Sequence, residues 1–289
     1  MASGTRYQQT IARTVSVSGC GYWSGLDVTV EFRPAAPDTG YVFVRRDLAG
    51  TPRIAARVES RCDVARRTVL VEGGASVDMV EHVLAALAGL HIDNCEIWVD
   101  RAEMPGLDGS SLAYVRALQR ALLVSQQVPR PRVAITETLR VGDHDQWISI
   151  GPADALQIDY ELVYEHPQIG RQVRNCTLDP ATFVQEICSA RTFLLQSEAE
   201  HLQRQGFGLR ARYQDLLVFG DEGPVANQLR FPDECVRHKV LDVVGDLALV
   251  PFDIVGKITA YRSGHALNAE LARRLLTTVA TGAPLLRSA

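Results

Sequence analysis

Hydrophobic residues alternate with polar ones in some stretches of this chain and recur at helical spacing in others. Alternation over residues 28–32 and again over 147–150 predicts two strands that are buried on one face only. Longer apolar or amphipathic stretches predict four helices, at residues 78–90, 111–124, 232–250 and 265–280.

The best linker candidate is Val-Pro-Arg-Pro at residues 128–131, because two prolines in three residues resist a helix and favour an extended connection. Strands precede helices on each side of it. We therefore predict two α+β domains of similar order, residues 1–127 and 128–289, although the sequence shows no convincing repeat.

Composition excludes some classes of protein. The chain has 289 residues, of which 46% are hydrophobic and 22% charged, which suits a sizeable core. Its net charge of −4 gives no electrostatic reason to expect nucleic-acid binding. No apolar run approaches the roughly 20 residues of a transmembrane segment, and the first residues lack the apolar stretch of a signal peptide. We expect a cytoplasmic protein, by default a monomer.

One predicted helix carries His238 and Asp242 one turn apart, opposite its apolar stripe. Together with His82, which lies beside Glu81, they are the ligand types of a hydrolytic zinc centre. Simpler interpretations exist for both segments: a solvated polar face for the first pair, and a capping box from Asp78 to Glu81 for the second. The spacing alone does not decide, because such pairs arise by chance in a chain of this composition.

Longer sequence motifs favour the zinc centre over these simpler interpretations. Val-Glu-His-Val-Leu-Ala-Ala-Leu-Ala-Gly-Leu-His-Ile-Asp-Asn at 80–94 resembles a known zinc motif, and 103–110 resembles the acidic loop that follows it. Residues 237–247 and 263–268 resemble two later motifs of the same family, with weaker matches at 33–35, 45–48 and 190–193. These segments, in this order, resemble the UDP-3-O-acyl-N-acetylglucosamine deacetylases of lipid A biosynthesis.

The resemblance implies an α+β fold of two similar two-layer domains, each a sheet with two helices, with the helices packed together between the sheets. The metal would lie at the domain interface, so that the polar face of the helix with His238 would border a cleft. The implied activity is zinc-dependent hydrolysis of the 2-acetamido group of UDP-3-O-acyl-N-acetylglucosamine, with release of acetate. The implied cofactor is Zn²⁺, and the partner is a UDP-linked N-acetylglucosamine derivative.

The resemblance also implies roles for individual residues. His82, His238 and Asp242 resemble the three zinc ligands, which would leave one coordination position open. Glu81 resembles the general base that takes a proton from the attacking water.

The remaining catalytic set follows from the same motifs. Thr192 resembles a hydroxyl that stabilises the tetrahedral oxyanion, and His265 resembles a charged histidine that stabilises it or protonates the departing amine. Asp246 resembles the carboxylate that holds His265 and raises its pKa. Three residues resemble substrate-binding side chains: Lys239 and Arg262 near the phosphates, and Phe193 on the sugar ring.

Several positions depart from the family pattern. Trp23 stands where the family has histidine, Asp78 stands in place of a small polar residue, and Gln146 stands where a lysine approaches the nucleotide. Arg210 and Arg212 fall where small residues border the acyl chain, and arginines are costly in a dry apolar tunnel. Two alternatives therefore stay open: a related zinc deacetylase for an N-acetylated sugar without a long acyl chain, and a non-catalytic binding protein on the same scaffold.

Overall fold

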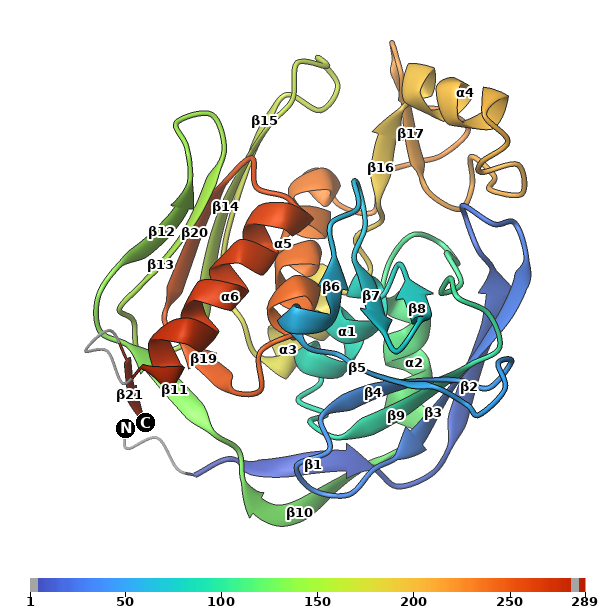
Figure 1. Cartoon of the computed structure of the whole chain (residues 1–289). Coiled ribbons are helices and arrows are strands. Elements are labelled where there is room, and N and C mark those ends of the chain that lie inside the picture. The colour runs from blue at the N-terminus through green and yellow to red at the C-terminus, as the bar shows by residue number, and fades with distance from the viewer. Residues whose placement is uncertain (1–4, 282–285, 289) are drawn as a thin grey trace.

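Two five-stranded sheets enclose a layer of helices in the computed structural model, which describes residues 5–281 and 286–288 (Figure 1). The first sheet has the order β2 (Val15–Cys20), β3 (Asp27–Pro34), β9 (Cys95–Val99), β4 (Tyr41–Arg45) and β5 (Arg53–Ala55). The second has the order β12 (Leu139–Gly142), β13 (Trp147–Gly151), β20 (Lys257–Tyr261), β14 (Gln157–Val163) and β15 (Arg171–Thr177).

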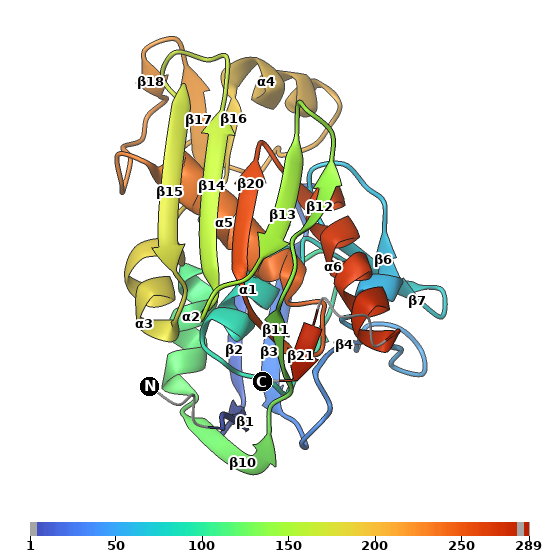
Figure 2. The same ribbon diagram turned by 90° about the vertical axis from the view of Figure 1, so that its left-hand side faces the viewer.

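The two sheets have the same topology. In each, the central strand pairs antiparallel with the strand on one side and parallel with the strand on the other. The outer strands pair antiparallel. Figure 2 shows the second sheet from the face that no helix covers, with helices behind it. This recurrence confirms the predicted pair of similar α+β units, which share a strand order without a recognisable sequence repeat.

The four predicted helices are present; the first three are shorter than predicted, and the fourth has the predicted bounds, 265–280. Helices α1 (Glu81–Gly89) and α2 (Leu112–Arg120) belong to the first half. Helices α5 (Glu234–Leu247) and α6 (His265–Ala280) belong to the second. Helix α1 packs against α5, and α5 and α6 cover the second sheet, so the helices meet between the sheets as expected (Figure 1).

The predicted capping box at the start of α1 is wrong. The residue that precedes the helix is Val80, which makes no side-chain cap, and Asp78 ends the preceding strand instead. The carboxylate of Asp78 accepts a hydrogen bond from Arg67 Nε at 2.7 Å. Asp78 lies two residues before the N-cap position and does not cap the helix.

Helices α1 and α5 cross at very short range. A Cβ atom on Gly245 would lie 2.1 Å from the carbonyl oxygen of Glu81. Any other residue at this position would force the two helices apart. The glycine therefore brings the first turn of α1 against the face of α5, which sets the distance between the functional side chains on the two helices.

Each half carries an insertion, which precedes α1 in the first half and α5 in the second. In the first half it is a three-stranded sheet of β6 (Arg61–Cys62), β7 (Val69–Glu72) and β8 (Ala75–Asp78). In the second half it consists of β16 (Phe193–Leu195), α4 (Gln196–Arg204), β17 (Leu217–Gly220) and β18 (Gly223–Pro224). Both insertions contribute walls to the same cavity.

The remaining strands connect the halves. Strand β1 (Tyr7–Ile11) pairs with β10 (Leu123–Pro129), and the predicted boundary between residues 127 and 128 lies within β10. Strand β11 (Arg132–Ile135) pairs with β19 (Asp253–Val255) and β21 (Leu286–Ser288). Three short helical segments complete the fold: η1 (Val58–Ser60), α3 (Pro180–Thr182) and the π-helical η2 (Phe183–Ile187). Within the described ranges, no helix combines the length and apolarity needed to cross a membrane.

Candidate active site

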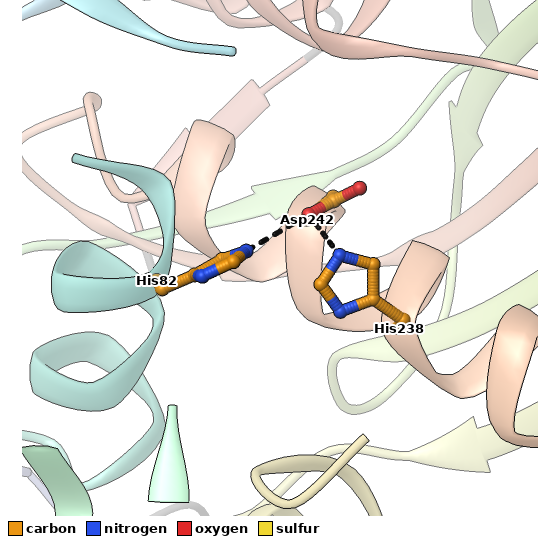
Figure 3. A group of neighbouring side chains, drawn as sticks. All are labelled: His82, His238 and Asp242. Carbon is orange, nitrogen blue, oxygen red and sulfur yellow. Dashed lines mark ion pairs between the residues drawn. The ribbon is translucent and has the colours of Figure 1, made fainter. Parts of the chain in front are cut away.

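Three predicted metal ligands meet between α1 and α5. His82 comes from the first turn of α1, whereas His238 and Asp242 lie one turn apart on α5, and all three are buried. The Nε2 atoms of His238 and His82 lie 3.4 and 3.9 Å from the same oxygen, Asp242 Oδ1 (Figure 3). One ligand atom from each side chain lies within 4.8 Å of the other two.

The polar contacts around this group fit a metal ion. Asp242 Oδ1 is buried without a hydrogen-bond partner in the described part of the chain, whereas Lys239 Nζ donates to the other oxygen, Oδ2, at 2.7 Å. An unpaired buried carboxylate oxygen is costly unless a cation satisfies it. His238 Nδ1 bonds the carbonyl of Ala190 at 3.1 Å, which turns Nε2 toward the centre. Two imidazole nitrogens and one carboxylate oxygen form a donor set that suits Zn²⁺.

The protonation states agree with metal binding. Burial, together with the neighbouring His238, lowers the pKa of His82 to about 3, and burial also lowers the pKa of His238. Both rings are therefore neutral near pH 7, which is the form that coordinates metals. Burial opposes ionisation of Asp242, but the positive charge of Lys239 above all holds its pKa well below its usual range.

Glu81 precedes the ligand His82 and lines the same cavity. Its side chain is buried, and Oε2 accepts a hydrogen bond from the backbone N–H of Thr68 at 3.0 Å. Burial raises the pKa of Glu81 to about 7. A carboxylate with this pKa can both accept and release a proton near neutral pH, as a general base must.

His265 and Asp246 form a second proton-handling pair. His265 begins α6, and its Nδ1 lies 2.8 Å from Oδ2 of the fully buried Asp246. An ionised carboxylate can only accept hydrogen bonds, so Nδ1 of His265 is the donor to Asp246. Because His265 lines the cavity, its other ring nitrogen, Nε2, is available to a substrate there. Burial by itself would lower the pKa of His265, but Asp246 raises it to about 9, so the ring is charged near pH 7.

A cavity of about 1120 Å³ connects these groups. One part of its wall is apolar and comes from β16, α4, β17 and the loop between α4 and β17. Six of its residues are Leu195, Ala199, Leu202, Phe207, Leu216 and Val218. The structure brings nine of the ten predicted site residues to this cavity; Asp246 is the tenth and lies behind His265.

The predicted substrate-binding residues lie at different distances from the metal group. The ring of Phe193 contacts that of His238, with a centroid separation of 6.5 Å. Arg262 and Thr192 line the cavity. Lys239 also lines it, but its ammonium group is bound to Asp242. Lys239 therefore contributes to the charge balance of the metal group as well as to the cavity wall.

The unusual residues near the cavity form specific contacts. The guanidinium of Arg67 lies 4.3 Å from the ring centroid of Trp23 while it pairs with Asp78. Trp23 in turn packs edge-on against Phe207, which belongs to the apolar wall. Asp78 is therefore neutralised by Arg67, and the aromatic ring of Trp23 joins the two insertions. Gln146 also lines the cavity.

Arg210 and Arg212 do not fill the apolar part of the cavity. The side chain of Arg210 is 52% exposed and pairs with Asp27 at 2.8 Å. That of Arg212 borders the cavity but is 72% exposed and pairs with Asp215 at 2.8 Å. The cost expected from arginines in a dry tunnel therefore does not arise.

Three further residues support the site, and none of them was predicted from the sequence. Ala190 acts through its backbone carbonyl, and Thr68 through its amide and hydroxyl. Asn268 donates to Asp246 Oδ2 at 2.8 Å. It stands within the segment 263–268, so the family motif could have indicated it. Ala190 likewise stands within the weaker match at 190–193, whereas nothing in the sequence marks Thr68.

Comparisons with known proteins agree with this geometry. A profile of the family described as LpxC, UDP-3-O-acyl N-acetylglycosamine deacetylase, matches residues 8–277. The chain is 39% identical to a UDP-3-O-acyl-N-acetylglucosamine deacetylase of Histophilus somni over 93% of its own length and 90% of that protein. The protein of this name from Pasteurella multocida gives the same identity and coverages. The one from Anaeromyxobacter sp. is 38% identical over 93% of this chain and 88% of its own length. The resemblance seen in the motifs is confirmed, and the chain belongs to the UDP-3-O-acyl N-acetylglycosamine deacetylase family.

Proposed function

We propose that this protein is a zinc-dependent hydrolase that removes the 2-acetyl group of UDP-3-O-acyl-N-acetylglucosamine in lipid A biosynthesis. The observation that carries the proposal is the unpaired buried oxygen of Asp242 between two neutral histidines, with Glu81 and His265 on the same cavity. The names of the relatives support the substrate. His82, His238 and Asp242 are the proposed zinc ligands.

When bound, zinc supplies Lewis acidity, which polarises the amide carbonyl and favours deprotonation of water. Glu81 accepts the proton of the water that attacks the amide carbon, and its raised pKa suits this exchange near neutral pH. The hydroxyl of Thr192 and the charged ring of His265 stabilise the negative charge that develops on the carbonyl oxygen.

The carbon–nitrogen bond then breaks. His265 donates its proton to the departing nitrogen, because an unprotonated amide nitrogen is a poor leaving group. The products are acetate and the free 2-amino sugar. Asp246 keeps the ring of His265 oriented and charged throughout.

The shape of the cavity favours an acylated substrate. Its apolar wall offers an alkyl chain a place to be buried, and burial of each CH₂ group contributes about 0.8 kcal/mol. Arg262 places positive charge elsewhere on the cavity wall, which suits the diphosphate, whereas the charge of Lys239 is paired with Asp242. A sugar without an acyl chain would leave the apolar wall unused.

The direct test is acetate release by the zinc-loaded protein from acylated and from non-acylated UDP-N-acetylglucosamine. We expect much faster turnover of the acylated substrate and loss of activity after chelation that added zinc restores. Faster turnover of the non-acylated sugar would favour the related-deacetylase alternative. No release from either substrate would favour a binding protein.

The pH dependence of the reaction should report on His265. Below its pKa of about 9 the ring holds the proton that the leaving amine needs, so the rate should fall as the pH rises through that value. Asp246→Asn removes the charge that raises this pKa. The fall should then occur about one pH unit or more lower.

The measurement is kcat as a function of pH for both proteins. Asp159→Asn is a suitable control, since it removes a carboxylate that pairs with Lys257 and does not line the cavity. An alkaline limb that stays in place in Asp246→Asn would contradict the role of His265 as the acid.

A further inference from the structure

We infer that Thr68 is a positioning residue that ties the proposed base and the proposed acid together across the interface between the two halves. The inference rests on the proposed function, because it assigns Glu81 and His265 those roles. Thr68 is fully buried, directly before strand β7 in the first insertion.

Thr68 uses both of its hydrogen-bond donors on catalytic carboxylates. Its backbone N–H donates to Glu81 Oε2 at 3.0 Å, and its hydroxyl donates to Asp246 Oδ1 at 2.6 Å. Glu81 lies on α1 of the first half, whereas Asp246 lies on α5 of the second. One residue therefore holds two carboxylates that the chain places on opposite helices.

The hydroxyl completes the hydrogen bonding of Asp246. Oδ2 of this carboxylate accepts from His265 Nδ1 and from Asn268 Nδ2, both at 2.8 Å. Oδ1 is then free for Thr68, whose Oγ1 also lies 3.5 Å from His265 Nδ1. Because Asp246 is fully buried, loss of the Thr68 donor would leave Oδ1 unpaired and allow the carboxylate to rotate.

Loss of the Thr68 hydroxyl should slow the step in which His265 acts as the acid. A rotated Asp246 carboxylate would no longer hold His265 in the orientation that points its other ring nitrogen at the substrate. A small misplacement of a reacting group costs rate more than it costs binding. Thr68 should therefore affect kcat, with little effect on KM or on the metal ligands, none of which it contacts directly.

Thr68→Val tests this with a nearly isosteric change. The variant keeps the backbone bond to Glu81 and loses only the hydroxyl. We expect kcat of the zinc-loaded protein to fall roughly 10- to 100-fold, the range for a buried hydrogen bond to a charged group. KM should stay within about threefold, and zinc content and thermal unfolding should stay close to those of the parent protein.

Two further variants separate positioning from general damage. Thr68→Ser retains the hydroxyl and should recover kcat to within about threefold of the parent. In an Asp246→Ala background, Thr68→Val should have almost no further effect, since the hydroxyl acts through that carboxylate. Thr10→Val is the matched control: Thr10 is buried, donates to the Asn94 carbonyl at 2.7 Å and does not line the cavity.

Three results would each overturn the inference. They are an unchanged kcat in Thr68→Val, a serine variant as poor as the valine variant, and an undiminished valine effect in the Asp246→Ala background. Failure of the proposed function would look different, because the parent protein would then release no acetate from either substrate, or its Glu81 and His265 variants would keep full activity. If those variants lose activity while Thr68→Val does not, only the role of Thr68 is refuted.

Discussion

Replacement of Glu81 with glutamine is expected to lower kcat for deacetylation by about 10²-fold or more, the usual scale for loss of a general base. The amide has the size of the carboxylate and can still accept the backbone hydrogen bond of Thr68. It cannot take a proton from water. Zinc should therefore remain bound at about one ion per chain while the chemical step fails.

The measurements are steady-state acetate release and metal content of the same preparation. Glu103→Gln provides a matched control, because Glu103 is also buried and also accepts backbone hydrogen bonds, from Trp23 and Ser24. It does not line the cavity and should keep kcat within about threefold. Full activity in Glu81→Gln would reject Glu81 as the base.

Replacement of His238 with alanine is expected to abolish activity because the protein should lose its zinc ion. Only His82 and Asp242 would remain as donors, one from each half of the protein. Two ligands do not make a structural or catalytic zinc site. We expect zinc affinity to fall by more than the 10- to 100-fold typical of losing a supporting contact, and activity to disappear at low zinc.

Metal analysis after dialysis, followed by activity against added zinc, checks this expectation. His201→Ala is the control, since His201 is an exposed residue of α4 outside the main cavity. It should retain the metal. Unchanged zinc content in His238→Ala would place the ion elsewhere and remove the basis of the proposed mechanism.

The helix with His238 shows what a pattern of hydrophobic positions can and cannot predict. Its apolar stripe predicted α5 correctly, but the polar face was equally compatible with solvent. In the structure that face is buried as well: His238, Asp242 and Asp246 are all at most 3% exposed. The difference lies in α1, which comes from a distant part of the sequence and covers this face. Family motifs, not periodicity, supplied that information.

Helix α2 shows a different limit of such patterns, because the predicted helix was too long at its C-terminal end. The apolar residues up to Val124 suggested that the helix would continue, yet it ends at Arg120. Leu122 adopts a positive φ of 61°, and Leu123 and Val124 enter strand β10 beside β1. A short apolar run fits either a helix or a strand, so only the pairing with β1 decides.

The orientation of long side chains was also beyond the sequence. Arg210 is directed to the surface by Asp27, which lies in the other half of the protein and far from it along the chain. Thr68 has its role because three elements meet around it. Such contacts are properties of the assembled fold, so residue type and spacing could not have revealed them.

The donors of the metal group come from both halves, and this has a mechanical consequence. An ion held by His82 of α1 and by two residues of α5 would act as a cross-link at the contact between these two helices. Its binding free energy then adds to the cohesion of that contact and leaves the interior of each half unaffected. Removal of the ion by a chelator should therefore first weaken the packing of α1 against α5, while both sheets stay folded.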